Sequence, residues 1–197
     1  MPTGVALRDA REQLFDAAES ILLRDGPSAL TSRAVTTEAG CAKGVLHRHF
    51  ADFDAFLAEL VLDRVARVEA SAATLCAAAG SGGVADHLAA ALTDLFGSVA
   101  VAIVGLVTSR DELRARLRQS LPTGVPVLTQ AAATIASYLA AERDLGRVAA
   151  DADIDALAPT LIGAAHLLFA DRTGAPPQEA AVRRVVATVM AGALVVP

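Results

Sequence analysis

The sequence has no tryptophan, one tyrosine and six phenylalanines among its 197 residues. A core with so few aromatic side chains must be built mainly from alanine, leucine and valine. Alanine and leucine are also good helix formers. Because 54% of the residues are hydrophobic, the chain is too apolar to be disordered. The composition therefore predicts a folded, all-α protein, long enough for one large domain or two small ones.

Cysteines, targeting signals and long apolar runs are also scarce or missing. The two cysteines show no spacing motif, which is typical of a reducing compartment. The N-terminus lacks the apolar core and the cleavage site of a signal peptide. The longest strongly apolar run, residues 95–108, is shorter than the ~20 residues that span a membrane. We therefore expect a cytoplasmic protein that does not enter a membrane.

Positive charge is limited too. The net charge is −5, and Lys43 is the only lysine. This excludes a cationic coat over the whole surface, so any contact with nucleic acid must be local. Residues 39–50, AGCAKGVLHRHF, contain that lysine together with two of the four histidines and one of the two cysteines. We therefore expect the chemistry of the protein to lie in this segment.

Apolar residues recur at helical spacing along almost the whole chain. Thr31 and Asp52 each precede such a stretch and are suitable N-cap residues, and glycines and prolines separate the stretches. This pattern predicts about nine helices, at residues 8–24, 31–39, 43–49, 52–79, 84–107, 111–119, 126–144, 153–172 and 177–195. The first three form a small N-terminal unit, which shares the helix at 52–79 with a larger C-terminal bundle.

Metal binding and nucleophilic catalysis are two possible roles for residues 39–50. His47 and His49 are two residues apart, so on a helix they point to nearly opposite sides and cannot share one ion. We therefore expect no metal site. A nucleophilic Cys41 would need a histidine within hydrogen-bond reach, and packing of a small side chain between two helices explains this residue better. No cofactor is expected.

A helix-turn-helix accounts for more of the segment. Two short helices joined by a sharp turn at Gly40 have this form, and the second helix would enter the major groove of DNA. Leu46 and Phe50, four residues apart, would anchor that helix to the core. His49 shares part of their inner side, so we expect it to be structural.

The remaining residues of the second helix suit contact with DNA. Lys43 supplies positive charge where the helix meets the duplex, and Gly44 lets the backbone approach closely. Val45 can touch a thymine methyl group. His47 and Arg48 lie on or near the exposed arc and can bind phosphates or base edges.

The segment at 26–61, GPSALTSRAVTTEAGCAKGVLHRHFADFDAFLAELV, resembles the N-terminal DNA-binding domain of the TetR family of bacterial transcriptional regulators. The matching features include Gly26, Ala39-Gly40, Gly44 and His49-Phe50, in register over about the first third of the chain. The resemblance implies a DNA-binding domain at 1–50, sharing the helix at 52–79, and a ligand-binding and dimerisation domain at 51–197. It assigns DNA contacts to Thr31, Arg33, Ala42, Lys43, Gly44, Val45, His47 and Arg48.

The segment also departs from the family pattern. Ala42 stands where a hydroxyl residue commonly caps the recognition helix, and Val45 and His47 replace threonine and tyrosine. Phe53 replaces a lysine that usually touches phosphate. Residues 1–64 carry seven cationic side chains against ten carboxylates. We therefore expect few phosphate contacts and a shallow dependence of DNA affinity on salt.

The resemblance further implies a homodimer, formed through the last two helices, on a palindromic DNA operator. The candidate interface residues are Leu157, Leu161, Ala165, Leu168, Val182, Val185, Val186, Val189 and Leu194. The middle helices would surround a small apolar, uncharged effector that releases the repressor from DNA. The candidate lining residues are Leu75, His87, Leu92, Phe96, Val99, Ile103, Tyr138, His166 and Phe169.

Two other functions remain open at this stage. One is a helical interaction protein in which DNA binding has weakened, since several phosphate-binding residues are missing. The other is an enzyme that uses Cys41 and His47. The sequence favours a ligand-responsive DNA-binding repressor over both.

Overall fold

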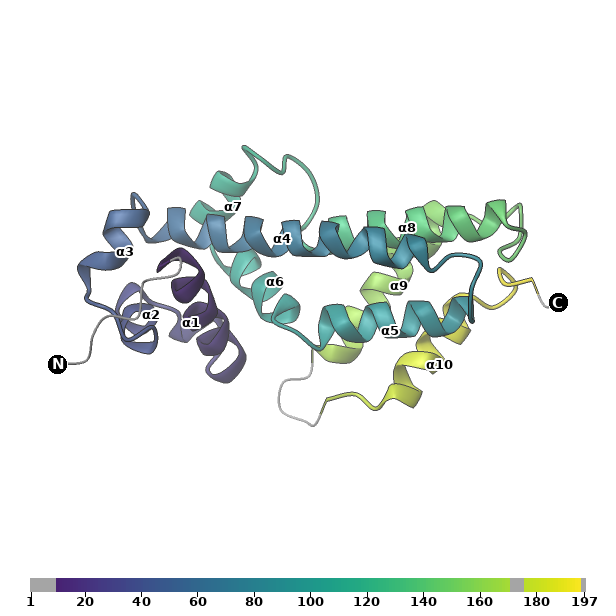
Figure 1. Cartoon of the computed structure of the whole chain (residues 1–197), viewed down its shortest axis with the longest axis horizontal. Coiled ribbons are helices and arrows are strands. Elements are labelled where there is room, and N and C mark those ends of the chain that lie inside the picture. The colour runs from purple at the N-terminus through teal and green to yellow at the C-terminus, as the bar shows by residue number, and fades with distance from the viewer. Residues whose placement is uncertain (1–9, 171–175, 196–197) are drawn as a thin grey trace. The chain divides into compact units, whose positions relative to one another are not determined.

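The computed structural model describes residues 10–170 and 176–195, and Figure 1 shows their course. Within these ranges the chain forms ten α-helices and no strand, so the predicted all-α class is confirmed. A short 3-10 helix, η1 (Pro27–Ala29), follows the first helix. The α-helices are α1 (Ala10–Arg24), α2 (Ser32–Glu38), α3 (Gly44–His49), α4 (Phe53–Ala77), α5 (Val84–Phe96), α6 (Ala100–Ser109), α7 (Asp111–Leu117), α8 (Leu128–Asp144), α9 (Ile154–Phe169) and α10 (Glu179–Val189).

The stretch expected to be one helix at 84–107 is two helices, α5 and α6, bent by 55° at the break. Gly97 caps the end of α5, at a position where a Cβ atom would lie 2.6 Å from the carbonyl oxygen of Thr93. The next residue, Ser98, turns its hydroxyl back to the carbonyl oxygen of Leu95. This hydroxyl competes for a backbone group at the helix end, as serine does at caps and turns. The single expected helix was therefore wrong.

The contacts divide the chain into two compact units. Unit 1 comprises residues 1–63 and 102–123, and unit 2 comprises residues 64–101 and 124–197. The helix α4 contributes its first part to unit 1 and its second part to unit 2. These units are defined by packing, whereas the predicted functional division at residue 50 stays a prediction.

Three phenylalanine rings form the centre of unit 1. The ring of Phe15, on α1, lies 5.9 Å from that of Phe50 and 5.6 Å from that of Phe56. The rings of Phe50 and Phe56 meet edge-on at 5.1 Å, a geometry that aromatic pairs prefer. Phe50 directly follows α3 and Phe56 lies in the first turn of α4. The cluster therefore fixes α3 against α1 and the start of α4.

Both predicted N-caps are confirmed. The hydroxyl of Thr31 accepts a hydrogen bond from the backbone N–H of Ala34, at 3.2 Å. The Oδ1 atom of Asp52 accepts one from the backbone N–H of Ala55, at 2.6 Å. Each cap satisfies a donor that the first turn of a helix leaves without an intrahelical partner. These local signals therefore determine where α2 and α4 begin.

In unit 2, α9 packs against α8 and α10, and α10 also packs against α5. The helices α4 and α5 run antiparallel, joined by the turn at residues 78–83 (Figure 1). Ala149 N–H donates to the carbonyl oxygen of Ala193 at 2.8 Å, and Val195 N–H donates to that of Arg147 at 3.0 Å. These bonds tie the loop after α8 to the segment after α10.

Candidate DNA-binding surface and internal cavity

A sharp turn sets the direction of α3 in unit 1. Gly40 has φ +62°, a left-handed conformation that glycine adopts without a steric penalty. The backbone N–H of Cys41 donates to the carbonyl oxygen of Thr36 at 3.0 Å. From α1, the Nε2 amide of Gln13 donates to the carbonyl oxygen of Ala39 at 2.8 Å. The end of α2 and the start of the turn are therefore held by both backbone and side-chain bonds.

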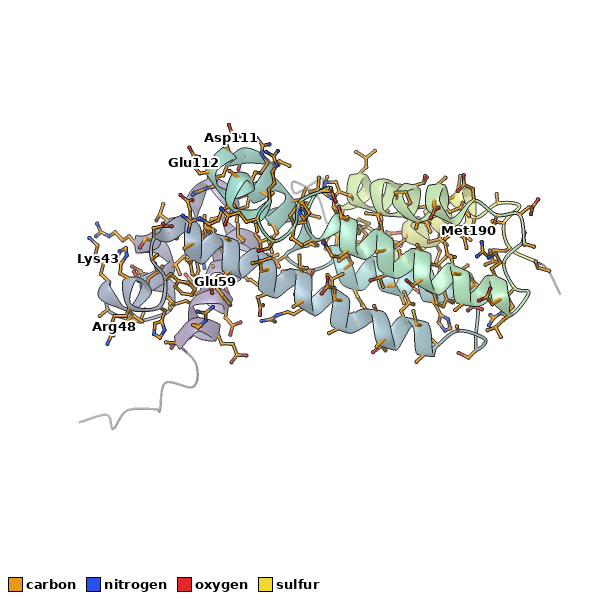
Figure 2. All side chains as sticks on the ribbon, turned by 90° about the horizontal axis from the view of Figure 1, so that it is seen from above. Lys43, Arg48, Glu59, Asp111, Glu112 and Met190 are labelled. Carbon is orange, nitrogen blue, oxygen red and sulfur yellow. The ribbon has the colours of Figure 1, made fainter. Side chains whose placement is uncertain are left out.

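The outward side of α3 is cationic and polar. Lys43, His47, Arg48 and His49 are all exposed, and Lys43 and Arg48 extend away from the ribbon in Figure 2. The exposed Gly44 has no atom within 4 Å of where a Cβ would lie, so its backbone surface is open. The residues predicted to contact DNA at Lys43, Gly44, His47 and Arg48 are therefore all accessible to solvent.

The inner side of α3 holds the helix to the core. Leu46 is fully buried and Phe50 nearly so, as expected for the two anchors. Val45 is also buried, at 8% exposure, so it does not share the outward side on which a thymine contact was expected. His49 was expected to be structural but is exposed, with its ring 6.4 Å from that of Phe50. The accessible histidine pair is therefore His47 and His49.

The other predicted DNA contacts flank this helix. Thr31 and Arg33, at the start of α2, are exposed, and so is Ala42 in the turn before α3. Lys43 is the N-cap residue of α3, and its side chain makes no capping hydrogen bond. The family pattern commonly has a hydroxyl at the preceding position, that of Ala42. Within the first turn of α3, the backbone N–H of Val45 donates to the carbonyl oxygen of Ala42 at 2.9 Å.

Arginines compensate the carboxylates of unit 1. Arg24 binds Glu38 through two parallel hydrogen bonds of 3.1 and 3.0 Å, and this contact lowers the pKa of Glu38. Arg11 pairs with Glu59, beside the phenylalanine cluster. These ion pairs partly cancel the negative formal charge of the unit.

Two further arginines come from α7 and the residue before it. Arg116 lies 3.0 Å from a carboxylate oxygen of Asp52. The pKa of Asp52 is lowered by its hydrogen bond from the backbone of Ala55 and then by Arg116. Arg110 lies 3.7 Å from Asp54, over the ring of Phe53. Among the residues that the structure describes, Lys43 and Arg48 have no such carboxylate partner.

Sequence reasoning missed Arg110 and Arg116, because they lie far from the helix-turn-helix in the chain and were assigned to the C-terminal bundle. Phe53 occupies the place of the family's phosphate-binding lysine, and the guanidinium of Arg110 lies 5.7 Å from the centre of its ring. Such a cation–π contact stabilises an arginine at this distance. An arginine from a different part of the chain therefore lies at the start of α4, where it is also paired with Asp54.

Unit 2 contains a partly open cavity of about 410 Å³ lined by residues of α4, α5, the turn between them and α8. This volume is within the range of small-molecule sites. Most of the lining is aliphatic, with two arginines, one aspartate, one histidine and three hydroxyl residues. The lining residues are Arg64, Arg67, Val68, Ser71, Thr74, Leu75, Ala78, His87, Ala90, Ala91, Asp94, Leu95, Ala131, Thr134 and Ile135.

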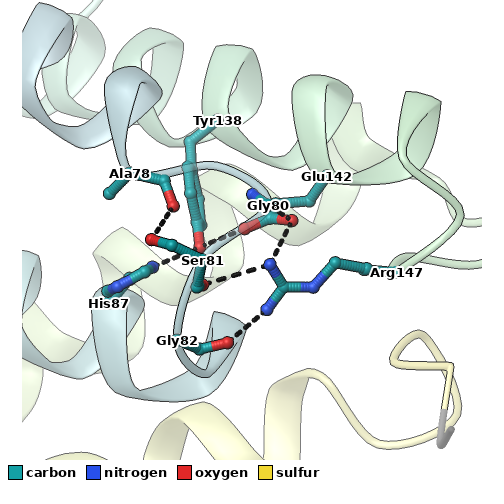
Figure 3. Close-up of polar contacts among 8 residues, drawn as sticks. All are labelled: Ala78, Gly80, Ser81, Gly82, His87, Tyr138, Glu142 and Arg147. Carbon is teal, nitrogen blue, oxygen red and sulfur yellow. Dashed lines mark hydrogen bonds and ion pairs between the residues drawn. The ribbon is translucent and has the colours of Figure 1, made fainter.

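A hydrogen-bonded chain leads from the cavity into the interior (Figure 3). The Nδ1 atom of His87 lies 2.9 Å from the hydroxyl of Tyr138, and that hydroxyl donates to Oε1 of Glu142 at 2.7 Å. Oε2 of Glu142 accepts from the backbone N–H of Gly80 at 3.3 Å and lies 3.3 Å from Nη1 of Arg147. The fully buried Glu142 is therefore bonded on both oxygens.

Of the nine predicted ligand-binding residues, Leu75 and His87 line the cavity. Tyr138 lies behind His87 and contacts it (Figure 3). Leu92, Phe96 and Val99 are buried in the core, and Ile103 belongs to unit 1. His166 and Phe169 form a separate cluster with Phe96, at ring distances of 5.7 and 5.9 Å. The two cavity arginines, Arg64 and Arg67, were not expected, because only the packing of α4 against α5 brings them there.

The predicted interface residues separate into two groups. Leu161, Ala165, Val182 and Val186 are buried within the chain and are part of its own core. Leu157, Leu168, Val185, Val189 and Leu194 are half-buried. Leu167, which was not predicted, is 77% exposed. An apolar contact with another chain would therefore use the second group and Leu167.

Within the described ranges, no three histidine, cysteine or acidic side chains are grouped so that they could hold a metal ion. Cys41 and Cys76 are both free thiols. In residues 10–170 and 176–195, no single helix is long and apolar enough to cross a membrane, although the bent pair of α5 and α6 passes that test by length and composition.

Comparison with known proteins agrees with this geometry. Residues 14–60 match the family model of bacterial regulatory proteins of the tetR family. No curated protein matches the chain in sequence.

Solved structures share the fold over nearly the whole chain. A transcriptional regulator from Rhodococcus sp. Rha1 is 20% identical, with 96% of this chain and 100% of that one covered and a TM-score of 0.70. A TetR transcriptional regulator from Streptomyces coelicolor is 21% identical, with 93% of this chain and 98% of that one covered and a TM-score of 0.63. FadR from Bacillus subtilis, solved in complex with stearoyl-CoA, is 17% identical, with 92% of this chain and 98% of that one covered and a TM-score of 0.65. Residues 14–60, which include the helix-turn-helix of residues 32–49, therefore match the tetR family model, and the chain shares its fold with these solved transcriptional regulators over nearly its whole length.

Proposed function

We propose that the protein is a ligand-responsive repressor that binds a palindromic operator as a homodimer. The observation that carries the proposal is the outward side of α3, where Lys43 and Arg48 are exposed and have no carboxylate partner among the described residues. Such side chains bind phosphates and the acceptor atoms of guanine in the major groove.

The residues around α3 have different roles in this proposal. Lys43, His47 and Arg48 reach base edges or nearby phosphates, and Gly44 allows close approach of the backbone. Thr31 and Arg33, at the start of α2, contact the sugar-phosphate backbone, as does the turn at Ala42. The buried Val45 positions the helix. Because Glu38, Asp52, Asp54 and Glu59 are paired with arginines, a chain with net charge −5 can still present a local cationic surface.

A single α3 reads only a few base pairs, so two copies on half-sites about 34–36 Å apart are needed for specificity. We propose that the dimer forms through α9 and α10. Leu167 supports this, because a leucine that is 77% exposed beside the half-buried Leu168 and the open surface at Gly163 favours apolar contact with a second chain.

The cavity of unit 2 is the proposed effector site. The helix α4 carries cavity residues in unit 2 and also bears Phe56 of the cluster that positions α3. A ligand that prefers one arrangement of α4 would shift the population of DNA-binding dimers, and operator binding would oppose ligand binding by the same factor. The stearoyl-CoA complex of Bacillus subtilis FadR supports a small-molecule effector for this fold. In functional terms, residues 1–50 then bind DNA and residues 51–197 bind ligand and partner.

The dimer can be tested with one pair of variants. Leu167→Arg places a charge in the proposed interface, and Leu145→Arg places the same charge at an apolar residue that is 57% exposed after α8. Sedimentation should give a dimer for the wild type and for Leu145→Arg, and a monomer for Leu167→Arg. The monomer should also lose specific binding to the promoter DNA upstream of its own gene. A dimeric Leu167→Arg protein with intact DNA binding would refute the interface.

A weakened DNA-binding domain is the alternative that the acidic composition of residues 1–64 favours. In that case the protein would act through other proteins, and it would bind promoter fragments no more tightly than unrelated DNA. An enzyme based on Cys41 and His47 has no supporting geometry, because His47 is on the exposed side of α3. Competition binding with specific and unrelated DNA decides between the regulator and the interaction protein.

A further inference from the structure

The cavity of unit 2 is elongated and has chemically different ends. Its α4 lining extends from Arg64 to Leu75, over which a helix advances roughly 16 Å. Because α5 runs antiparallel to α4, Asp94 and Leu95 belong to the Arg64 end and His87 to the opposite one. Valine, leucine, isoleucine and alanine side chains line the middle. A ligand that fills this space therefore has a long apolar body.

One end carries a buried guanidinium donor that has no hydrogen-bond partner in the part of the chain that the structure describes. Arg64 is half-buried, and its Nη2 donates to the hydroxyl of Ser98. Its Nε is buried and has no hydrogen-bond partner within the described residues. A buried donor without a partner is unfavourable. Arg67 lies three residues further along α4, on the same side of the helix, and also lines the cavity.

The charges around this end favour an anion. Arg64 and Arg67 face one lining carboxylate, that of Asp94, which is exposed. The guanidinium group presents several N–H donors in a planar fork that matches a carboxylate or a phosphate. An acidic group on the ligand would therefore satisfy Nε of Arg64.

The hydrogen-bonded chain of Figure 3 begins at His87, which lines the other end of the cavity. The hydroxyl of Tyr138 has one proton, which it gives to Glu142. It can therefore only accept from His87, so Nδ1 of His87 is the donor in the 2.9 Å contact. Glu142 is bonded to Tyr138, Gly80 and Arg147 and has no exposed surface. This end therefore orients the ligand through His87. The acidic group of the ligand lies at the opposite end, beside Arg64 and Arg67.

We infer that the effector is an elongated organic acid whose anionic head binds Arg64 and Arg67 and whose apolar body extends along α4 and α5 toward His87. The inference rests on the proposed ligand-responsive function and replaces the expectation of an uncharged effector. Asp94 limits the affinity for the acid, because it is a like charge beside the anionic head.

Three probes with the same ten-carbon chain test the head group: decanoate, decyl phosphate and decan-1-ol. Calorimetry on the full chain should show that at least one of the two anions binds ~10-fold or more tightly than the alcohol, the ratio expected for a charged hydrogen bond. The double variant Arg64→Gln/Arg67→Gln should lose this preference. Arg184→Gln, which removes an exposed arginine of α10, should keep it.

Asp94→Asn provides an independent test that does not disturb the arginines. Removing the like charge should strengthen anion binding by about 3-fold or more and leave decan-1-ol binding unchanged. The inference is overturned if the alcohol binds as tightly as both anions, if none of the probes binds, or if Asp94→Asn weakens anion binding. It is also overturned if the preference survives in a folded Arg64→Gln/Arg67→Gln protein.

Operator DNA separates this inference from the proposed function. If an anion binds with the expected preference but does not change operator affinity, the head-group assignment stands and induction through this cavity fails. If an uncharged molecule binds in the cavity and releases the operator whereas no anion binds, the proposed release of the operator by a ligand is supported. The assignment of an anionic head group is then wrong.

Discussion

Tyr138 donates its hydroxyl proton to Glu142 across 2.7 Å, and both side chains are fully buried. Burial, and then this hydrogen bond, raise the pKa of Tyr138 far above its usual value. Through the other oxygen of Glu142, the pair also holds Gly80 and Arg147. Because Arg147 in turn donates to the carbonyl oxygens of Ser81 and Gly82, this one contact connects α8 to the turn between α4 and α5.

Tyr138→Phe should therefore destabilise unit 2. The ring still fills its space, but the buried carboxylate of Glu142 and Nδ1 of His87 each lose a partner, which costs about 1–3 kcal/mol per group left unsatisfied. Asp144→Asn, at an exposed site on the same helix, should stay within about 0.5 kcal/mol of the wild type. Urea denaturation followed by circular dichroism measures both. A Tyr138→Phe protein as stable as the wild type would show that the contact contributes little.

His166 should make the protein less stable in mild acid. Burial lowers the pKa of His166 below the ordinary value of 6.5, and its Nδ1 has no partner among the residues that the structure describes. As the pH falls through 6.5, the unfolded chain takes up a proton that the folded chain resists. The contribution of His166 to the free energy of unfolding is therefore fully present above pH 6.5. It is lost as the pH falls from 6.5 toward the pKa of His166 in the folded protein.

The pH dependence of stability from 7.5 to 5.5 tests this assignment. His166→Gln should lose less stability over that interval than the wild type, because the variant has no group to protonate at this position. His49→Gln, at an exposed position, should lose as much as the wild type. Equal losses in His166→Gln and in the wild type would assign the acid sensitivity elsewhere.

The structure agrees best with the sequence where the signals are local. The caps at Thr31 and Asp52, the glycine turn at Gly40 and the anchors at Leu46 and Phe50 each depend on residues a few positions apart. The break at Gly97 was missed because one glycine inside an apolar run is compatible with a continuous helix.

The least predictable features depend on packing between distant segments. Arg64 and Arg67 look like solvent-exposed residues of a long helix until α5 folds back beside α4 and forms a cavity with them. The predicted interface residues on α9 and α10 pose the same difficulty. Their helical periodicity shows that they share one face of each helix, but it does not distinguish the core of one chain from an interface between two chains. Leu161 and Val186 are core, whereas Leu167, outside the predicted stripe, is exposed.

The side chains of α3 also predict what the operator contains. Lys43, Arg48 and the two exposed histidines can donate hydrogen bonds, and no exposed carboxylate or amide lies on this helix to accept one from cytosine or to pair with adenine. Guanine offers two acceptors in the major groove. Selection from random duplexes should therefore enrich half-sites with guanine, about one helical turn apart. Half-sites that contain only A·T pairs would contradict this assignment.

The central claim, that α3 reads DNA through its outward side, is tested most directly by operator affinity after Lys43→Gln/Arg48→Gln. Arg118→Gln, which changes an exposed arginine at the end of α7, is the matched control. At one fixed salt concentration, fluorescence anisotropy should show about 100-fold or greater loss for the double variant, from two base or phosphate contacts, and little change for the control. If a folded Lys43→Gln/Arg48→Gln protein binds the operator as tightly as the wild type, α3 is not the DNA-reading helix.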